Sequence, residues 1–201
     1  MGYIDPIEVA RVINYHKELL KIYKITESNA MGWGEDSQSI RFKILSQIDD
    51  LNNKSVLDIG CGNGNLYDFL KKIYPALRYA GLDLVEEFLE HATSRINSSD
   101  VQFFKGNYMS DQLPMFDYYI LSGSLNYKSK NPLHIFESIN HLFKSARLGL
   151  GFNLLSKVPE NQDIAMAYNS KMVLEFCKTL SDKCILKEGY LNNDYTIFMY
   201  H

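Results

Sequence analysis

The sequence predicts an α/β fold in which helices cover a mostly parallel, doubly wound sheet. From about residue 55 onward, short runs rich in β-forming residues alternate with amphipathic stretches of helical period, which is the pattern of such a fold. The length of 201 residues suits one compact domain with a modest appendage. No internal repeat or low-complexity tract interrupts the pattern.

The expected elements follow one another without long gaps. We expect strands at 55–59, 78–84, 101–105, 116–121, 147–154, 183–187 and 195–200. We expect helices between them at 65–73, 85–96, 132–143 and 170–180. The last two strands should form a hairpin through residues 188–194.

The first fifty residues have a different, helical character. Asp5 can cap a helix, Pro6 suits its first position and Glu8 would complete a capping box, so a helix should run to about Tyr23. After the turn at 31–34, apolar residues at 40, 44, 45, 48 and 51 predict a second helix. We therefore divide the chain into a helical cap or lid at 1–50 and a core at 51–201, joined in one compact domain.

Charge and composition exclude several classes of partner. The formal net charge is −3, and the longest basic run is the pair Lys71-Lys72, so we expect no nucleic-acid partner. Cys61, Cys177 and Cys184 form no CxxC motif, and their odd number favours free thiols. No stretch approaches the ~20 apolar residues of a bilayer span, and charges run through the amino-terminal segment. We expect a cytoplasmic protein with no membrane partner.

The run VLDIGCGNGN at residues 56–65 is the most informative stretch of the sequence. It reads as a buried strand, a turn with glycines at 60, 62 and 64, and a helix start whose N–H groups can bind a ligand. A tight strand-to-helix turn without a ligand is the alternative. The spacing differs from the G-x-G-x-x-G of dinucleotide sites, and Asp58 would repel a pyrophosphate. That carboxylate suits a ligand with ammonium and sulfonium groups, as in S-adenosylmethionine.

Asp83 is a second acidic marker, at the tip of the next expected strand. A carboxylate about 20 positions past a glycine loop can accept hydrogen bonds from a ribose diol. The alternative is a cap for the following helix, and one side chain can serve both purposes.

Together with these features, the segments YAGLDL, FFKGNYMSD and FDYYILSGSLN resemble the class I S-adenosylmethionine-dependent methyltransferases. The flanking MGWGEDSQSIRF, GFNLLS and NDYTIFMY resemble a small bacterial stand-alone group within that superfamily. The resemblance implies a Rossmann-like seven-stranded sheet of order 3-2-1-4-5-7-6 with the last strand antiparallel, and with the amino-terminal helices capping the site.

The resemblance also implies cofactor contacts. The methionine part would lie against the glycine loop and the tip of the fourth strand, at Asp58, Gly60, Cys61, Gly62 and Ser122. The ribose and adenine would contact Asp83, Leu84, Gly106, Asn107 and Tyr108, although many relatives have Asp at position 107. Lid contacts would come from Trp33, Gln38 and Arg41, with Arg41 either gripping the cofactor carboxylate or lying on a solvated helix face.

Acceptor and catalytic residues are expected near the lid. His16 is the candidate general base, and Tyr15, Asn126, Tyr127 and Asn153 are candidate acceptor contacts, although the amides could instead serve their own loops. Ser122, Gly123 and Ser124 at the tip of the fourth strand offer no carboxylates, so we expect no metal. The Asn/Asp-Pro-Pro-aromatic motif typical of nucleic-acid base methylation is absent from the sequence.

These observations favour an S-adenosylmethionine-dependent methyltransferase that releases S-adenosylhomocysteine and acts on oxygen or nitrogen of a small molecule. A sugar or secondary-metabolite intermediate is a reasonable acceptor, and the protein would be a monomer or homodimer. The alternatives are a cofactor-binding protein without catalysis and a nicotinamide-dependent reductase.

Overall fold

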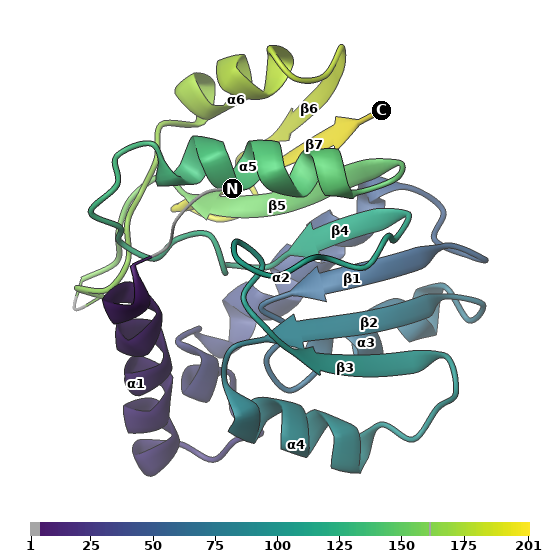
Figure 1. Ribbon diagram of the computed structural model, residues 1–201, viewed down its shortest axis with the longest axis vertical. Coiled ribbons are helices and arrows are strands. Elements are labelled where there is room, and N and C mark those ends of the chain that lie inside the picture. The colour runs from purple at the N-terminus through teal and green to yellow at the C-terminus, as the bar shows by residue number, and fades with distance from the viewer. Residues whose placement is uncertain (1–4, 161) are drawn as a thin grey trace.

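A seven-stranded sheet of order β3-β2-β1-β4-β5-β7-β6 forms the centre of the protein (Figure 1). The computed structural model describes residues 5–160 and 162–201. The strands are β1 (Ser55–Ile59), β2 (Arg78–Asp83), β3 (Val101–Lys105), β4 (Tyr118–Leu121), β5 (Gly149–Leu155), β6 (Lys183–Lys187) and β7 (Asp194–Tyr200).

Strand pairing confirms the predicted fold. β1 pairs in parallel with both β2 and β4, while β7 runs antiparallel between β5 and β6. Because β2 and β4 lie on opposite sides of β1, the chain extends from β1 first toward one edge of the sheet and then toward the other. In open α/β sheets the crevice beyond the carboxyl ends at such a point is where ligands bind.

Helices cover both faces of the sheet. They are α1 (Pro6–Ile22), α2 (Glu35–Leu45), α3 (Asn65–Ile73), α4 (Glu86–Arg95), α5 (His134–Ser145) and α6 (Ser170–Lys178), with short 3₁₀ turns η1 (Ser28–Met31) and η2 (Ser46–Ile48). Alternating residues of β1 face opposite sides: Leu57 and Ile59 join the core under α5 and α6, and Val56 joins the core under α2 and α3. Each such side chain stabilises the fold by about 1.5–3 kcal/mol through burial.

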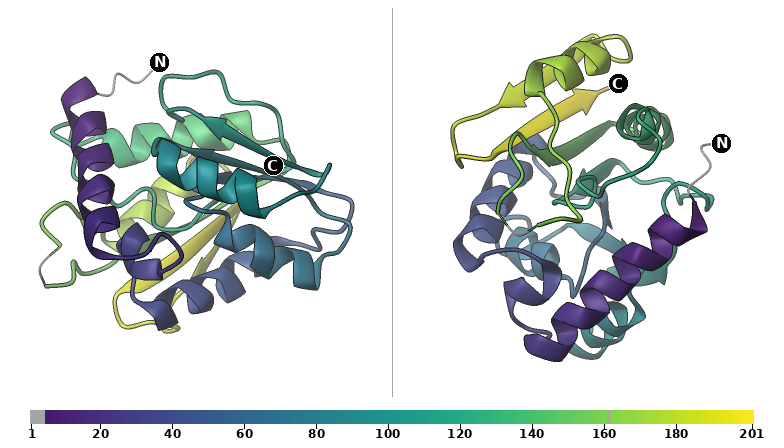
Figure 2. Two further views of the ribbon diagram at one scale, coloured as in Figure 1. Left: turned by 90° about the horizontal axis from the view of Figure 1, so that it is seen from below. Right: turned by 90° about the vertical axis from the view of Figure 1, so that its left-hand side faces the viewer.

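Helix α1 lies across the carboxyl ends of the strands, away from the two faces (Figures 1 and 2). Its first N–H groups are capped as predicted, since the Asp5 carboxylate accepts from the Ile7 N–H at 2.9 Å. Glu8 has a different partner, because its carboxylate accepts from the Lys130 N–H at 2.6 Å. With the ion pair between Lys17 and Glu87 at 2.9 Å, α1 is fixed to the loop after β4 and to α4.

Several predicted boundaries differ from the observed ones, and two of the differences have a visible physical cause. The helical pattern that continues to residue 51 does not keep α2 intact, because the chain tightens into η2 after Leu45 and the Ser46 hydroxyl donates to the Lys43 carbonyl at 3.0 Å. Strand β4 starts at Tyr118 because the Asp117 carboxylate accepts from the Ser55 N–H at 2.8 Å at the entrance to the sheet.

None of the helices within 5–160 and 162–201 combines the length and apolar character needed to cross a bilayer.

Candidate functional site

A cleft of about 1160 Å³ opens at the carboxyl ends of β1, β2 and β4, under α1. That volume includes space open to solvent at the mouth of the cleft. The structure brings most predicted site residues to its walls. These are His16, Trp33, Gln38, Asp58, Gly60, Cys61, Gly62, Asp83, Leu84, Gly106, Asn107, Tyr108, Ser122 and Tyr127.

The glycine loop forms the floor of the cleft and has no room for side chains. Gly60 and Gly62 have φ of +76° and +53°, a region that L side chains rarely adopt. A Cβ on Gly60 would lie 2.4 Å from the Ser124 Cβ, and one on Gly62 would lie 2.6 Å from the Met31 sulfur. The loop therefore needs glycine at both positions for close packing as well as for its backbone conformation.

Asp83 fastens this loop to the end of β2. Its two carboxylate oxygens accept from the backbone N–H groups of Gly62 at 2.8 Å and Val85 at 2.9 Å. Burial raises the pKa of Asp83 above its usual value, although the backbone donors and His16 oppose the shift. Each carboxylate oxygen has a second lone pair, so the group can accept further hydrogen bonds from a ligand.

Asp58 is the other carboxylate at the cleft. It is 2% exposed, and it accepts a hydrogen bond from the Tyr79 hydroxyl at 2.6 Å. Burial raises its pKa to about 7, helped by the charge of Asp83 and opposed by the Tyr79 hydrogen bond. A positively charged ligand would favour the ionised form of this carboxylate.

The segment after η1 covers the glycine loop. The Trp33 ring packs so tightly on Gly123 that a Cβ there would lie 2.0 Å from a ring carbon. The Arg41 guanidinium lies 3.9 Å from the Trp33 ring centroid, and its Nε donates to Asp194 Oδ2 at 2.7 Å. Arg41 is 4% exposed, so it does not lie on a solvated helix face, and it is not among the described residues that line the cleft.

His16 projects from α1 into the cleft and bonds Tyr127. Its Nε2 lies 2.6 Å from the Tyr127 hydroxyl and its Nδ1 lies 3.4 Å from the Ala30 carbonyl oxygen. With the Nδ1 proton directed at that carbonyl, Nε2 accepts from the tyrosine. Burial lowers the pKa of His16, and burial raises the pKa of Tyr127. The pair is thus a neutral imidazole that holds a protonated phenol.

The remaining predicted acceptor residues lie behind the cleft wall. Tyr15 and Asn126 border a separate, smaller space, which Tyr127 also borders. Asn126 accepts from the Leu155 N–H at 2.9 Å, and Asn153 accepts from the Gly123 N–H at 2.8 Å. Both amides therefore support the loops around the site.

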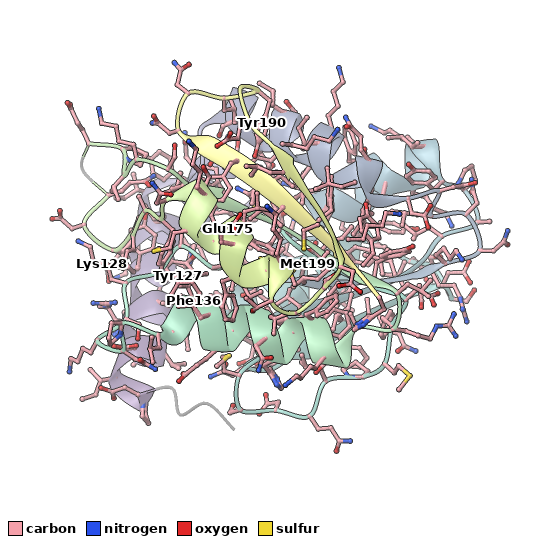
Figure 3. The ribbon with its side chains drawn as sticks, turned by 90° about the horizontal axis from the view of Figure 1, so that it is seen from above. Tyr127, Lys128, Phe136, Glu175, Tyr190 and Met199 are labelled. Carbon is pink, nitrogen blue, oxygen red and sulfur yellow. The ribbon has the colours of Figure 1, made fainter. Side chains whose placement is uncertain are left out.

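Several lining residues escaped the sequence analysis. Val9 and Val12 line the cleft with His16, which follows them on one face of α1 at helical spacing, and this spacing was the available signal. Lys128 reaches the cleft from the β4–α5 connection and His134 from the first position of α5, and Figure 3 shows Lys128 beside Tyr127 on the side where α1 lies. Their place depends on how this loop meets α1, which no local pattern reveals.

Among the described residues, no group of three or more His, Cys, Asp or Glu side chains could hold a metal ion.

Comparisons with known proteins agree with this geometry. Residues 56–146 match a family described as a methyltransferase domain. The chain is 39% identical over 57 residues to malonyl-[acyl-carrier protein] O-methyltransferase of Acetivibrio thermocellus, a match covering 27% of this chain and 20% of that protein. It is 31% identical over 74 residues to demethylmenaquinone methyltransferase of Lactococcus lactis, covering 35% of this chain and 29% of that protein. The matches thus span less than a third of these relatives.

Solved structures extend the likeness of the fold to the whole chain. The magnesium protoporphyrin IX methyltransferase of Synechocystis with bound S-adenosylmethionine superposes with a TM-score of 0.71 at 14% identity, covering 100% of this chain and 99% of that one. Human N-acetylserotonin methyltransferase gives a TM-score of 0.63 at 14% identity, covering 96% of this chain and 65% of that one. Residues 56–146 therefore match a methyltransferase domain, and the whole chain shares the fold of these solved methyltransferases.

Proposed function

We propose that the chain binds S-adenosylmethionine in the cleft and methylates a small-molecule acceptor at oxygen or nitrogen. The observation that carries this proposal is the pair of carboxylates, buried Asp58 and half-buried Asp83, beside a glycine loop that admits no Cβ. A ligand with an ammonium and a sulfonium group compensates buried negative charge, whereas the pyrophosphate of a nicotinamide cofactor adds to it.

In this proposal, residues at different positions along the cleft bind different parts of the cofactor. Asp58, Gly60, Cys61, Gly62 and Ser122 hold the methionine part, and Trp33 and Gln38 cover it. Asp83 accepts from the ribose hydroxyls, while Leu84 and the turn Gly106-Asn107-Tyr108 contact the adenine. Arg41 supports this cover through Trp33, because it packs on that ring and lies outside the described cleft lining.

When bound, S-adenosylmethionine would supply a methyl group to an acceptor atom that gives up a proton, and the cofactor would leave as S-adenosylhomocysteine. The protein's main task is to hold the acceptor in line, which can supply about 7–11 kcal/mol of the barrier. For a hydroxyl acceptor, the proton passes to the Tyr127 oxygen as the Tyr127 proton passes to His16 Nε2. Such base catalysis typically contributes about 10²–10⁴-fold.

The names of the sequence relatives support a small acceptor. Two of them are named for small molecules, a demethylmenaquinone methyltransferase and a methyltransferase of tetracenomycin polyketide synthesis. The third is named for a malonyl group that an acyl carrier protein holds. We further propose that the protein works in the cytoplasm as a monomer or homodimer, without a nucleic-acid, membrane or metal partner.

Turnover separates this proposal from a cofactor-binding protein without catalysis. The protein is incubated with S-adenosylmethionine and a panel of hydroxyl and amine acceptors, and S-adenosylhomocysteine and methylated products are measured by mass spectrometry. Product that disappears in a Gly62→Val variant supports the enzyme. Tight cofactor binding with no product from any acceptor supports the non-catalytic alternative.

A further inference from the structure

Trp33 is the sole tryptophan of the sequence, and it borders the cofactor cleft. Its indole has two close neighbours that come from different elements. The Arg41 guanidinium of α2 lies over the ring, 3.9 Å from the centroid, and a cation in this position is attracted to the face of the ring. Gly123, in the loop after β4, packs against the indole so closely that any side chain there would overlap it. The position of Trp33 therefore depends on what holds Arg41 and Gly123.

Arg41 is held by a carboxylate from a distant part of the chain. Its Nε donates to Asp194 Oδ2 at 2.7 Å, and Asp194 is the first residue of β7. The two residues are 4% and 5% exposed, so little water competes for the pair. A charge-assisted hydrogen bond of this kind fixes the direction of a guanidinium. Since the planar guanidinium also faces the indole, Asp194 sets the position of the Trp33 ring through Arg41.

Gly123 is held by an amide on the neighbouring strand. Asn153 of β5 is fully buried, and its Oδ1 accepts from the Gly123 N–H at 2.8 Å. The antiparallel register pairs Leu155 of β5 with Asp194 of β7, and residues two apart on a strand face the same side of the sheet. Asn153 and Asp194 therefore face the same side, and Figure 1 shows their strands side by side. One pair of strands thus supplies both supports of the indole.

We propose that Asp194 and Asn153 are positioning residues for the cofactor, although neither is among the described residues that line the cleft. They act by holding the Trp33 indole against the methionine part of S-adenosylmethionine. This inference rests on the proposed function and extends the cofactor machinery to the β5–β7 pair. Because both residues act through one ring, replacing either should weaken cofactor binding, and the loss should vanish once the ring itself is removed.

The test measures the affinity of the full chain for S-adenosylhomocysteine by calorimetry and the fluorescence emission of its single tryptophan. Asp194→Asn removes the carboxylate charge of the ion pair, and Asn153→Ala removes the acceptor of the glycine N–H. Asp117→Asn is the matched control, because this buried carboxylate also pairs with an arginine but lies at the opposite edge of the sheet from the cleft. Trp33→Leu, alone and combined with Asp194→Asn, completes a double-mutant cycle. If Asp194→Asn does not fold, Arg41→Lys replaces it, since Lys keeps the charge and loses the planar group.

We expect Asp194→Asn and Asn153→Ala each to bind S-adenosylhomocysteine more weakly than the parent, by roughly fivefold or more. Their tryptophan emission should move to longer wavelength, because the indole is released toward water. Asp117→Asn should match the parent in affinity and in emission. In the Trp33→Leu background, Asp194→Asn should change the affinity by less than about twofold.

Parent affinity in a folded Asp194→Asn or Arg41→Lys protein, or an equal loss of affinity with and without the indole, would overturn the inference and leave the cofactor assignment intact. An Asp117→Asn protein that loses as much affinity as Asp194→Asn would also overturn it, since the effect would then follow a general loss of stability. Failure of the parent to bind S-adenosylhomocysteine, measured first, would overturn the proposed function and this inference with it.

Discussion

Replacing Asp58 with Asn should stabilise the protein, and by an amount that depends on pH. Burial raises the pKa of this carboxyl from its usual 3.8 to about 7, so the folded chain retains a proton that the unfolded chain loses between these values. The free energy of unfolding therefore falls as pH rises through this window. A shift of about 3 pKa units corresponds to about 4 kcal/mol once pH exceeds 7.

Asn has the same size as Asp, carries no charge and keeps an oxygen that accepts from the Tyr79 hydroxyl. Asp58→Asn should thus raise the free energy of unfolding by up to about 4 kcal/mol at pH 8 and by under about 2 kcal/mol at pH 5. For a chain of this size, 1 kcal/mol moves the melting temperature by roughly 2–4 °C. Urea unfolding followed by circular dichroism at both pH values measures the difference.

Asp117→Asn is the control with the opposite sign. Burial raises the pKa of this carboxyl, but hydrogen bonds from Ser55 and the ion pair with Arg147 outweigh that effect and lower it. Stability that depends on ionised Asp117 is present above the usual pKa and is lost as pH falls, so the variant should be less stable than the parent at pH 8. If Asp58→Asn is no more stable than the parent at pH 8, or if its gain is the same at pH 5, the reasoning about a strained carboxylate is wrong.

Three further changes test other parts of the site. Gly123→Ala should lower stability by about 1–3 kcal/mol in thermal unfolding, because its φ is +80° and a Cβ would overlap the neighbouring indole; a neutral result would contradict the tight lid packing. Arg41→Met should lower the free energy of unfolding by about 3–5 kcal/mol, because it leaves the Asp194 carboxylate unpaired. Adding Asp194→Leu should recover most of that loss. If Arg41→Met alone is as stable as the parent, the ion pair does not contribute significantly to stability. His16→Asn should lower kcat for a hydroxyl acceptor by about 10²–10⁴-fold and Tyr127→Phe should also lower it. The parent's rate should rise with pH and level off below the usual histidine pKa of 6.5, and a midpoint above that value would argue against His16 as the base.

The local hydrophobic pattern predicts the secondary structure of this chain well where the residues of a segment serve a single element. β1 follows from Val56, Leu57 and Ile59 just before the glycine turn, and α3 follows from that turn and its own amphipathic period. Where the same apolar residues serve both a helix and the core beyond it, the hydrophobic pattern predicts the wrong boundary. The apolar spacing continues past Leu45 because η2 also buries Ile48 against the sheet, so periodicity alone could not reveal the end of the helix. The strand order came from the family resemblance, since periodicity carries no information on which strands are neighbours.

The candidate site was predictable where it depends on strand ends and glycines. Asp58 and Asp83 end neighbouring parallel strands, which places them at one edge of the sheet. The pairing of Arg41 with Asp194 joins residues 153 positions apart, and no motif marks it. The bridge between Tyr127 and Ala165 likewise joins segments far apart in the sequence, and no local pattern marks it.

Calorimetric titration of S-adenosylmethionine into the parent and Gly62→Val proteins at pH 8, with reduced nicotinamide adenine dinucleotide as the competing ligand, tests the central claim most directly. We expect the parent to bind S-adenosylmethionine at one site per chain and to ignore the dinucleotide, and we expect the folded Gly62→Val protein to lose that binding. Binding of the dinucleotide in place of S-adenosylmethionine, or undiminished binding by Gly62→Val, would contradict the account.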